Sequence, residues 1–514
     1  MTSAVTVLDR DFHQLISRRA RTLMALAGFL SQCRSSREFM VRPFLGEFFS
    51  QSMQMEELLD AYDARNNCQW CLFGSLIAAI KLFSDVSYEL LHIQHALPAY
   101  RLLPIEHDFA SATQRALEFT GEVLSRAAKR ILGGACQLGL EIPSDNPPHD
   151  FYSEKLPPGR LPRDCGARRT ESTAETVTLL ATAFLNLASE SKDVRLAARA
   201  KPAEYDRYLS DSIKEENLRN LELRFHNLQS LYDTHVSGTE IESEDTDLLV
   251  LRGHISVVFH LLKVATAFAH HYERHVNRQF CQVRASLQPL VTAEALLEIL
   301  MNYSVNYISL YIGCAEDLCR QMLSRYAEVG QVEVSVPPYR GFHVRPATLI
   351  AKLALHYGSK VCMQMDNEIY DASSPLELFR ANEKINAQKR RQLAAEIMRL
   401  ELTHQECKNG NIEILVHNVL QKLVEQSRLI LYEHPVQLPP ELISKPGPLL
   451  QNVTDIMAQL LVMGKIDVKA ELAAKFIGDK RVLADIQLLA ESGYGEDNFG
   501  NNIPLPEKLA YLRR

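Results

Sequence analysis

Residues 331–347 read QVEVSVPPYRGFHVRPA, and this stretch decides the fold class because the periodicity of the sequence changes inside it. In residues 331–336, three valines alternate with Gln, Glu and Ser, which is the pattern of a half-buried β-strand. Pro346 then suits the first turn of a helix, where a missing backbone N–H is not needed. The stretch therefore predicts a strand, a short loop that contains Gly341, and a helix.

The residues that follow predict a small α+β domain. The expected elements are a helix from Pro346 to Tyr357, strands at 360–365 and 369–372, a helix opening at Pro375, a strand at 411–416 after the turn signal Asn409-Gly410, and a helix at 419–432. The order is β-α-β-β-α-β-α over residues 331–434. The predicted fold class is mainly α, with this α+β domain inserted after a long helical region.

The loop before Pro346 carries a candidate chemical site. His343 stands at the predicted helix N-terminus, where free backbone N–H groups and the positive end of the helix dipole favour an anion. Arg345 adds a guanidinium that can hold a phosphate at two points. An imidazole beside such a helix end is suited to accept a phosphoryl group. The alternative interpretation is that His343 only caps the helix.

The stretch Gly341-Phe342-His343-Val344-Arg345-Pro346-Ala347 resembles the active-site signature of HPr, the histidine-containing phosphocarrier protein of the bacterial sugar phosphotransferase system. That signature is Gly-(Leu/Phe)-His-X-Arg-Pro-Ala, and the chain matches it at every fixed position. The predicted element order is also that family's order. The resemblance covers residues 331–434.

The resemblance implies an open-faced sandwich and a set of roles. His343 would be phosphorylated through Nδ1, and Arg345 would hold the phosphoryl group. Gly341, Pro346 and Ala347 would form the helix start at the phosphate, where the free backbone N–H groups of that start would assist; Pro346 itself has none. The donor would be phosphorylated enzyme I, charged from phosphoenolpyruvate. No cofactor is implied, and the transfer is phosphocarrier chemistry rather than enzymatic turnover.

Three departures from the family pattern stand out. Glu377 occupies the place of the family's regulatory serine. Its carboxylate either imitates the charge of a phosphoserine or belongs to a solvated helix residue. Control by a serine kinase would then be absent, unless Ser373 or Ser374 takes the place of that serine in a shifted register. Residues 380–408 form an enlarged, charged helical segment, which either docks the domain on the helical region or blocks the usual partner surface. Arg340 either adds positive charge to the phosphate site or points to solvent.

The remaining residues are predicted to be helical, apart from one connector. The expected regions are an N-terminal helical region at 1–141, a Pro-rich connector at 142–172, a helical bundle at 173–330 and a helical C-terminal tail at 435–514. The Lys389-Arg390-Arg391 run inside the enlarged segment is predicted to be a solvated face.

Three histidines in the bundle region give a metal-site hypothesis. His260, His271 and His275 lie roughly along one face of a predicted helix, where a bundle core could combine them with carboxylates of other helices. None of these three histidines belongs to a Glu-x-x-His pair, and there is no His-Glu-x-x-His motif, so hydrogen-bonded core histidines are the favoured interpretation.

Composition limits the classes of function. The chain has 514 residues, a prior of about three domains, and its net charge of −7 argues against a nucleic-acid-coating protein. Ten sparse cysteines predict reduced thiols, and residues 1–23 lack the apolar core of a signal peptide. These features predict a cytoplasmic protein without membrane insertion.

Three functional hypotheses follow from the sequence. The leading one is a regulatory phosphoacceptor that takes a phosphoryl group on His343 from an enzyme I-like donor. The second is a non-catalytic HPr-like interaction module on a helical scaffold, and the third is a helical-bundle metal site. The acceptor or regulated protein is not identified by the sequence, and a homo-oligomer stays open.

Overall fold

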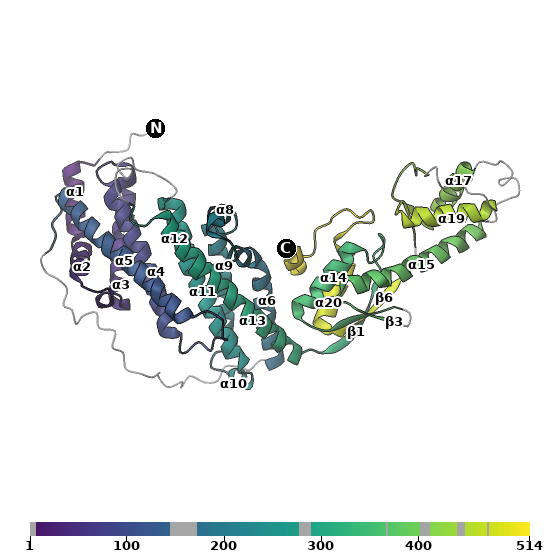
Figure 1. The fold of residues 1–514 in the computed structure, drawn as a ribbon, viewed down its shortest axis with the longest axis horizontal. Helices are drawn as coiled ribbons and strands as arrows, with labels where there is room; N and C mark the ends of the chain where they lie inside the picture. Colours follow the sequence, from purple (N-terminus) through teal and green to yellow (C-terminus); the bar gives the residue numbers. More distant parts are fainter. Residues whose placement is uncertain are drawn as a thin grey trace. The chain divides into compact units, whose positions relative to one another are not determined.

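The computed structural model describes residues 7–143, 172–276, 289–365, 368–400, 412–438, 448–469 and 472–513. The chain divides into two compact units, Met1–Cys319 and Arg320–Arg514 (Figure 1). The boundary falls inside helix α13 (Asn306–Arg325). Most of the described residues are helical and a small sheet lies in the second unit, so the predicted mainly α class is confirmed. The predicted connector at 142–172 lies almost entirely outside the described residues.

Within its described residues, the first unit contains helices and connecting loops and no strand. Its longer helices are α1 (Asp9–Arg19), α2 (Arg21–Gln32), α3 (Arg42–Ala61), α4 (Cys71–Ala96), α5 (Phe109–Gln137), α6 (Thr173–Glu190), α9 (Glu215–His235) and α11 (Asp247–His271). Shorter helices are α7 (Lys192–Ala197), α8 (Tyr205–Asp211), α10 (Ile241–Glu244) and α12 (Ala293–Ile299), and η5 (Tyr272–Val276) continues α11. Helix α11 packs against both α4 and α9 and is apolar on both sides, as expected for a central helix of a bundle.

Two helices of this unit are long and apolar enough to cross a membrane by length and composition. They are Cys71–Ala96 and Asp247–Val276, and 67% of the apolar window of each is buried. A buried core helix passes the same test, so packing within the bundle accounts for their apolar character. Among the described cysteines, six form no disulfide, namely Cys33, Cys68, Cys136, Cys314, Cys319 and Cys362. Cys71 is disulfide-bonded, which departs from the expectation of thiols throughout.

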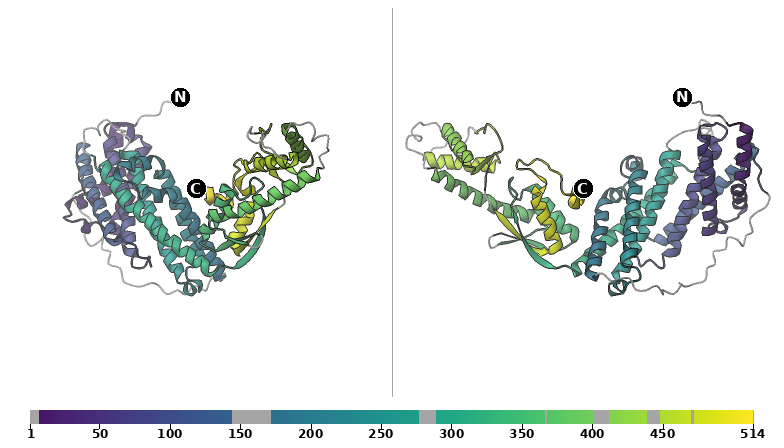
Figure 2. Two further views of the ribbon diagram at one scale, coloured as in Figure 1. Left: turned by 45° about the vertical axis from the view of Figure 1, so that its right-hand side comes forward. Right: turned by 180° about the vertical axis from the view of Figure 1, so that it is seen from behind.

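The second unit is built on a four-stranded antiparallel sheet. Its strands are β1 (Val329–Ser335), β2 (Val361–Met365), β3 (Glu368–Asp371) and β6 (Ala473–Asp479), in the spatial order β1-β6-β2-β3. The helices α14 (Val344–Tyr357), α15 (Pro375–Arg399) and α20 (Lys480–Glu491) accompany it (Figure 2). Side chains alternate along the strands: Phe476 and Met363 are fully buried in the core, whereas Lys475 and Gln364 lie on the other, more open face.

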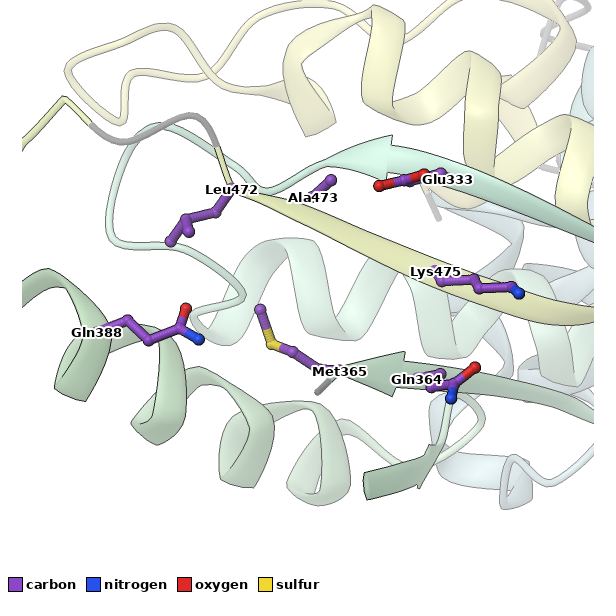
Figure 3. A pocket seen from close by; sticks show the side chains of 7 residues that line it. All are labelled: Glu333, Gln364, Met365, Gln388, Leu472, Ala473 and Lys475. Carbon is purple, nitrogen blue, oxygen red and sulfur yellow. The ribbon is translucent and has the colours of Figure 1, made fainter. Parts of the chain in front are cut away.

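The open face of the sheet carries a shallow pocket of about 420 Å³. Figure 3 shows its lining residues on β1, β2, β6 and α15, which are Glu333, Gln364, Met365, Gln388, Leu472, Ala473 and Lys475. None of them is a histidine or an arginine, so this pocket is separate from the predicted phosphoacceptor residues.

Most of the strands and helices predicted near the motif are confirmed, but the last strand was predicted in the wrong place. Residues 412–425 form helix α17 (Ile412–Glu425), not a strand. Its buried residues recur at helical spacing along one face, namely Ile412, Leu415, Val416, Val419, Leu420 and Leu423. The Asn409-Gly410 turn signal lies outside the described residues.

The predicted helical tail at 435–514 is also wrong in part, because it supplies a strand to the interior of the sheet. Strand β6 lies between β1 and β2 and pairs with both. Gly478 makes this position possible: its φ is +157°, and a Cβ there would lie 2.6 Å from the Lys360 carbonyl oxygen. The α+β domain therefore extends through α20 rather than ending at residue 434.

Residues between α15 and β6 form a small additional layer, which we call the inserted subdomain. It consists of α17, β4 (Leu429–Leu431), α19 (Leu449–Val462) and β5 (Ile466–Val468), with β4 and β5 paired antiparallel. It shares one hydrophobic core with the C-terminal half of α15, where Leu393 and Ile397 contact residues such as Val453 and Met457. Residues 380–399 of the predicted enlarged segment are helical, as part of α15, and residues 401–408 lie outside the described residues. The inserted subdomain is a further enlargement that the sequence analysis did not predict.

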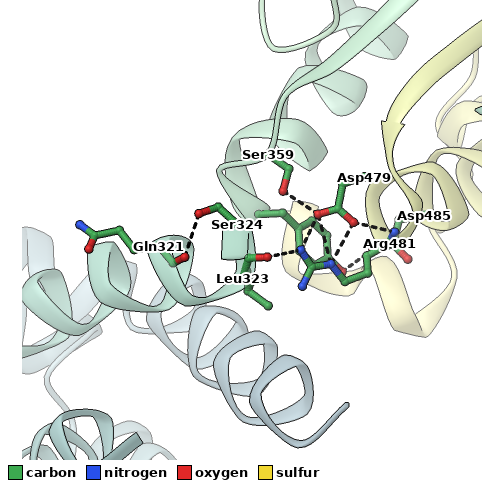
Figure 4. Close-up of polar contacts among 8 residues, drawn as sticks. Gln321, Leu323, Ser324, Ser359, Asp479, Arg481 and Asp485 are labelled. Carbon is green, nitrogen blue, oxygen red and sulfur yellow. Dashed lines mark hydrogen bonds and ion pairs between the residues drawn. The ribbon is translucent and has the colours of Figure 1, made fainter. Parts of the chain in front are cut away.

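The junction between β6 and α20 holds the second unit together (Figure 4). Arg481 donates to the Leu323 carbonyl oxygen at 2.7 Å and pairs with Asp479, which in turn accepts from Ser359 Oγ at 2.7 Å. Burial raises the pKa of Asp479, but Arg481 and Ser359 outweigh it and hold that pKa below its usual value. The Asp479–Arg481 pair therefore connects the ends of α13 and α14 to the start of α20.

Candidate functional site

The candidate site begins at a loop with two consecutive left-handed residues. Arg340 and Gly341 have φ of +57° and +64°. Gly341 is required here, because a Cβ would lie 2.2 Å from Asn382 Oδ1 of α15. Phe342 then enters the core with ring centroids 6.2 Å from Phe476. This sharp turn brings His343 to the start of α14.

His343 is the N-cap residue of α14, as predicted. The first backbone bond of the helix runs from the Ala347 N–H to the His343 carbonyl oxygen at 3.1 Å. The N–H groups of Val344 and Arg345 precede that bond and have no carbonyl partner within the helix. Together with the helix dipole they provide donors for an anion next to His343.

A buried carboxylate already contacts the predicted site residues. His343 Nε2 lies 2.8 Å from Glu496 Oε2, and Arg345 Nε lies 3.7 Å from Glu496 Oε1. The Glu496 side chain is only 6% exposed. When the carboxylate is ionised and the imidazole is neutral, this contact requires the ring hydrogen to be on Nε2, because an ionised carboxylate can only accept. The lone pair is then on Nδ1, the nitrogen that the resemblance predicts as the phosphoacceptor.

Glu496 reaches the site through a tight turn after α20, and sequence reasoning missed it. Gly493, Tyr494 and Gly495 are all left-handed, with φ of +74°, +57° and +71°. The Tyr494 hydroxyl donates to the Ser335 carbonyl oxygen at 2.6 Å and so fastens the turn to the end of β1. The two glycines were the only sequence signal for this turn, and nothing in their spacing indicated His343 as the destination.

Aromatic side chains line one side of His343. The Tyr339 ring lies edge-on to the His343 ring at 5.5 Å, and Tyr432 of the inserted subdomain contacts Tyr339 at 4.9 Å. Burial, followed by the charge of Asp467, raises the pKa of Tyr432 above its usual range, so this phenol is neutral. The inserted subdomain therefore contributes a neutral ring behind Tyr339.

Arg340 contacts the inserted subdomain. Its Nη2 donates to the Met463 carbonyl oxygen at 2.9 Å, and its backbone N–H donates to Asp467 Oδ2 at 3.3 Å. Its guanidinium lies 5.6 Å from the centre of the Tyr339 ring. Neither sequence-based alternative for Arg340, charge for the phosphate site or a side chain free in solvent, anticipated this anchoring contact.

The residues at the start of α15 form local contacts. Glu377 pairs with Arg380 at 2.8 Å on the surface, and Ser374 is the N-cap, its Oγ accepting from the Glu377 N–H at 3.4 Å. Ser373 Oγ donates to Asp371 Oδ1 at 2.7 Å. The prediction for the Lys389–Arg391 run is wrong for Lys389, whose side chain is 4% exposed and pairs with Asp467.

The bundle histidines do not converge in the first unit. His260 Nδ1 lies 2.7 Å from Glu89 Oε2, and its ring is 4.3 Å from that of His92, which sequence reasoning did not single out. His271 stacks on His275 at 5.1 Å. Within the residues that the structure describes, no group of three metal-ligating side chains could hold an ion. The metal-site hypothesis therefore gains no support from this part of the chain.

The contact of His260 with Glu89 gives a prediction for stability. Burial raises the pKa of Glu89, but the hydrogen bond from His260 and the charge of Lys263 outweigh it and lower the pKa from 4.5 to about 2. A carboxylate with a lowered pKa stabilises the fold above pH 4.5, and that stability is lost as the pH falls towards 2. Glu89→Gln should therefore cost roughly 3 kcal/mol of unfolding free energy near neutral pH, with a deficit that shrinks below pH 4.5. Denaturant titrations of both proteins at several pH values measure this; a deficit independent of pH would contradict it.

Comparison with known proteins adds no relative. No protein-family model, no curated protein and no solved structure matches the chain. The arrangement of His343, Arg345 and Glu496 at the start of α14 is thus the feature from which a function can be inferred.

Proposed function

We propose that this protein is a regulatory phosphoacceptor of the HPr type, in which His343 takes a phosphoryl group from a phosphorylated enzyme I-like donor of the bacterial sugar phosphotransferase system. The observation that carries the proposal is the site at the start of α14. There, His343 is the N-cap of the helix and directs Nε2 to Glu496, so Nδ1 is the nitrogen left without this contact. The first amides of the helix have no carbonyl partner within it, and Arg345 contacts the same carboxylate as His343.

The topology of the second unit supports the same proposal. When the inserted subdomain is left out, the order of elements is β1-α14-β2-β3-α15-β6-α20. This is the β-α-β-β-α-β-α order of the resemblance, with β6 and α20 in place of the elements expected at 411–432. One face of the sheet is buried and the other is open, as in an open-faced sandwich.

The chemistry of transfer needs no proton from His343. The Nδ1 lone pair attacks phosphorus, the bond from phosphorus to the donor breaks, and its electron pair leaves with the donor. The ring becomes positively charged and keeps its hydrogen on Nε2, where the Glu496 carboxylate stabilises the charge at 2.8 Å. The helix-start amides and Arg345 stabilise the phosphoryl oxygens.

A regulatory role follows from the charge that the phosphoryl group brings. It adds about −1.5 to −2 charges next to a carboxylate that is almost fully buried. Repulsion and competition for Arg345 would weaken the Glu496 contacts and loosen the turn at Gly493–Gly495. Phosphorylation would thus be converted into a change in the C-terminal segment, which a partner protein could recognise.

A second candidate function is a non-catalytic interaction module. The observation that favours it is the same Glu496 carboxylate, because it already engages both His343 and Arg345. In that case the carboxylate permanently takes the place of a phosphoryl group, and the site is a structural relic that holds the C-terminal segment.

One experiment separates the two functions. The full-length protein is incubated with enzyme I and labelled phosphoenolpyruvate, and with phosphoenolpyruvate alone as the control. The phosphoacceptor proposal predicts enzyme I-dependent label that is lost in acid and retained in base, close to one phosphate per chain. Absence of such label, from a protein whose melting curve shows it folded, would reject the phosphoacceptor and leave the interaction module.

A further inference from the structure

We propose that Asp467 of the inserted subdomain is a positioning residue for the phosphoacceptor loop, residues 340–343. This inference rests on the proposed function and explains what holds the loop in the conformation that places His343. Asp467 Oδ2 accepts the backbone N–H of Arg340 at 3.3 Å. Arg340 is the first of the two left-handed residues that bring His343 to the helix start. The inserted subdomain therefore touches the backbone that sets the geometry of the site.

The Asp467 carboxylate is well placed to act as a fixed anchor. Its side chain is 3% exposed and pairs with Lys389 of α15 at 2.8 Å, and its Oδ1 accepts the Val468 N–H at 2.7 Å. A buried carboxylate with a single defined set of donors has little freedom to move, because any other position leaves a charge without a partner. The pair thereby joins β5 to α15 directly behind the loop.

Arg340 is held from three directions. Besides the contact to Asp467, its carbonyl oxygen accepts from Asn382 Nδ2 at 3.0 Å, and its guanidinium donates to the Met463 carbonyl oxygen at 2.9 Å. The guanidinium lies so close to Gly464 that a Cβ there would be 1.6 Å from Nη2. The chain thus has a glycine at the point where the Arg340 side chain crosses it.

These contacts matter because a left-handed Arg is intrinsically unfavourable. Only glycine, and sometimes Asn or Asp, adopts this conformation without strain, so a left-handed Arg persists when its surroundings over-determine it. Without the anchor, Arg340 would relax towards a right-handed or extended conformation, and the peptide that leads to His343 would rotate with it. The inserted subdomain therefore orients the phosphoacceptor instead of only enlarging the domain.

The test compares two double variants that differ in whether residue 467 keeps an oxygen that can accept a backbone N–H, from Arg340 or from Val468. Lys389→Met/Asp467→Asn removes both buried charges and keeps an amide oxygen that can accept; Lys389→Met/Asp467→Leu removes the charges and the acceptor. Glu328→Gln, which breaks the exposed pair of Glu328 with Lys480, is the control for unrelated charge loss. For each protein we would measure label transfer to His343 over a range of donor concentrations, and hydrogen exchange of residues 338–345.

The positioning role predicts that the Asn variant transfers within about threefold of the wild type. The Leu variant should lose about ten- to a hundredfold in maximal rate with little change in KM for the donor, because an unmade buried hydrogen bond misplaces the nucleophile rather than the docking surface. Its loop amides should also exchange faster than those of the Asn variant, while residues of α20 are unchanged. Equal rates and equal loop exchange in the two double variants would overturn the inference. If even the wild type takes no label, the proposed function fails, and the exchange of the loop alone decides whether Asp467 positions it.

Discussion

Replacing His343 with Ala is expected to abolish enzyme I-dependent, acid-labile phosphate uptake completely, in a protein whose melting curve shows it to be folded. In the account given above, the imidazole is the nucleophile at the start of α14. Its hydrogen bond from Nε2 to Glu496 leaves the lone pair on Nδ1 to attack phosphorus. Its side chain is 21% exposed, so its removal leaves no core cavity, and the cost in stability comes from Glu496, which keeps only Arg345 as its charged partner. Complete loss of uptake from a protein that is still folded is the signature of a chemical role.

Two matched variants assign roles to the neighbours of His343. Glu496→Gln keeps an oxygen that accepts from Nε2, so uptake is expected to persist, whereas Glu496→Leu removes it and should slow uptake about tenfold. Arg345→Ala is expected to lower the rate about 10²- to 10³-fold, because it removes a donor to the transferred group. Uptake that survives His343→Ala undiminished would place the phosphoacceptor elsewhere and contradict this account of the site.

Replacing Phe476 with Ala is expected to destabilise the second unit by about 3–5 kcal/mol. Phe476 is fully buried in β6, between the strands β1 and β2, and packs against Phe342 next to the site. For a unit of this size, such a loss lowers the melting temperature by roughly 10 °C. Calorimetry of the full-length protein measures this as a shift of the transition that belongs to the second unit.

The control for Phe476 is Ile414→Ala. Ile414 is 58% exposed on α17, within the segment that the sequence pattern predicted as the last strand. In the observed structure this change removes an exposed side chain from a helix surface and should alter stability by less than about 0.5 kcal/mol. If Ile414→Ala were severely destabilising and Phe476→Ala harmless, residues 411–416 would be the interior strand after all.

The first half of the α+β domain was predictable because its signals are local. Alternating valines indicated β1, Pro375 opened α15, and Gly358 adopts the left-handed conformation expected after α14. His343 and Arg345 could be placed at a helix start from the motif alone. In each of these cases the deciding residues lie within one turn or one strand of the feature that they specify.

The second half was not predictable because its deciding contacts are distant in sequence. Strand β6 begins with two alanines, contains no β-branched residue other than Ile477 and is followed directly by α20, so its sequence carries a weak strand signal. What makes it a strand is pairing with β1 and β2 over more than a hundred residues. A short apolar stretch such as 411–416 is ambiguous between helix and strand until the neighbours that cover it are known.

Glu496 and Lys389 show the same limit for side chains. Charged residues are usually solvated, so a carboxylate near the end of the chain and a basic run on a long helix are expected on the surface. Both are buried here because each has a partner from another segment, His343 with Arg345 for Glu496 and Asp467 for Lys389. Pairing across the fold, which no local pattern encodes, determines their burial.

Phosphorus NMR of the full-length protein, after incubation with enzyme I and phosphoenolpyruvate, tests the central claim most directly. The account predicts one phosphohistidine resonance, attached at Nδ1 because Glu496 holds the hydrogen on Nε2, and absent from His343→Ala. A resonance from phosphate at Nε2, or the same resonance in His343→Ala, would contradict the proposed geometry. The absence of any phosphohistidine resonance from the folded protein would contradict phosphoacceptor function itself.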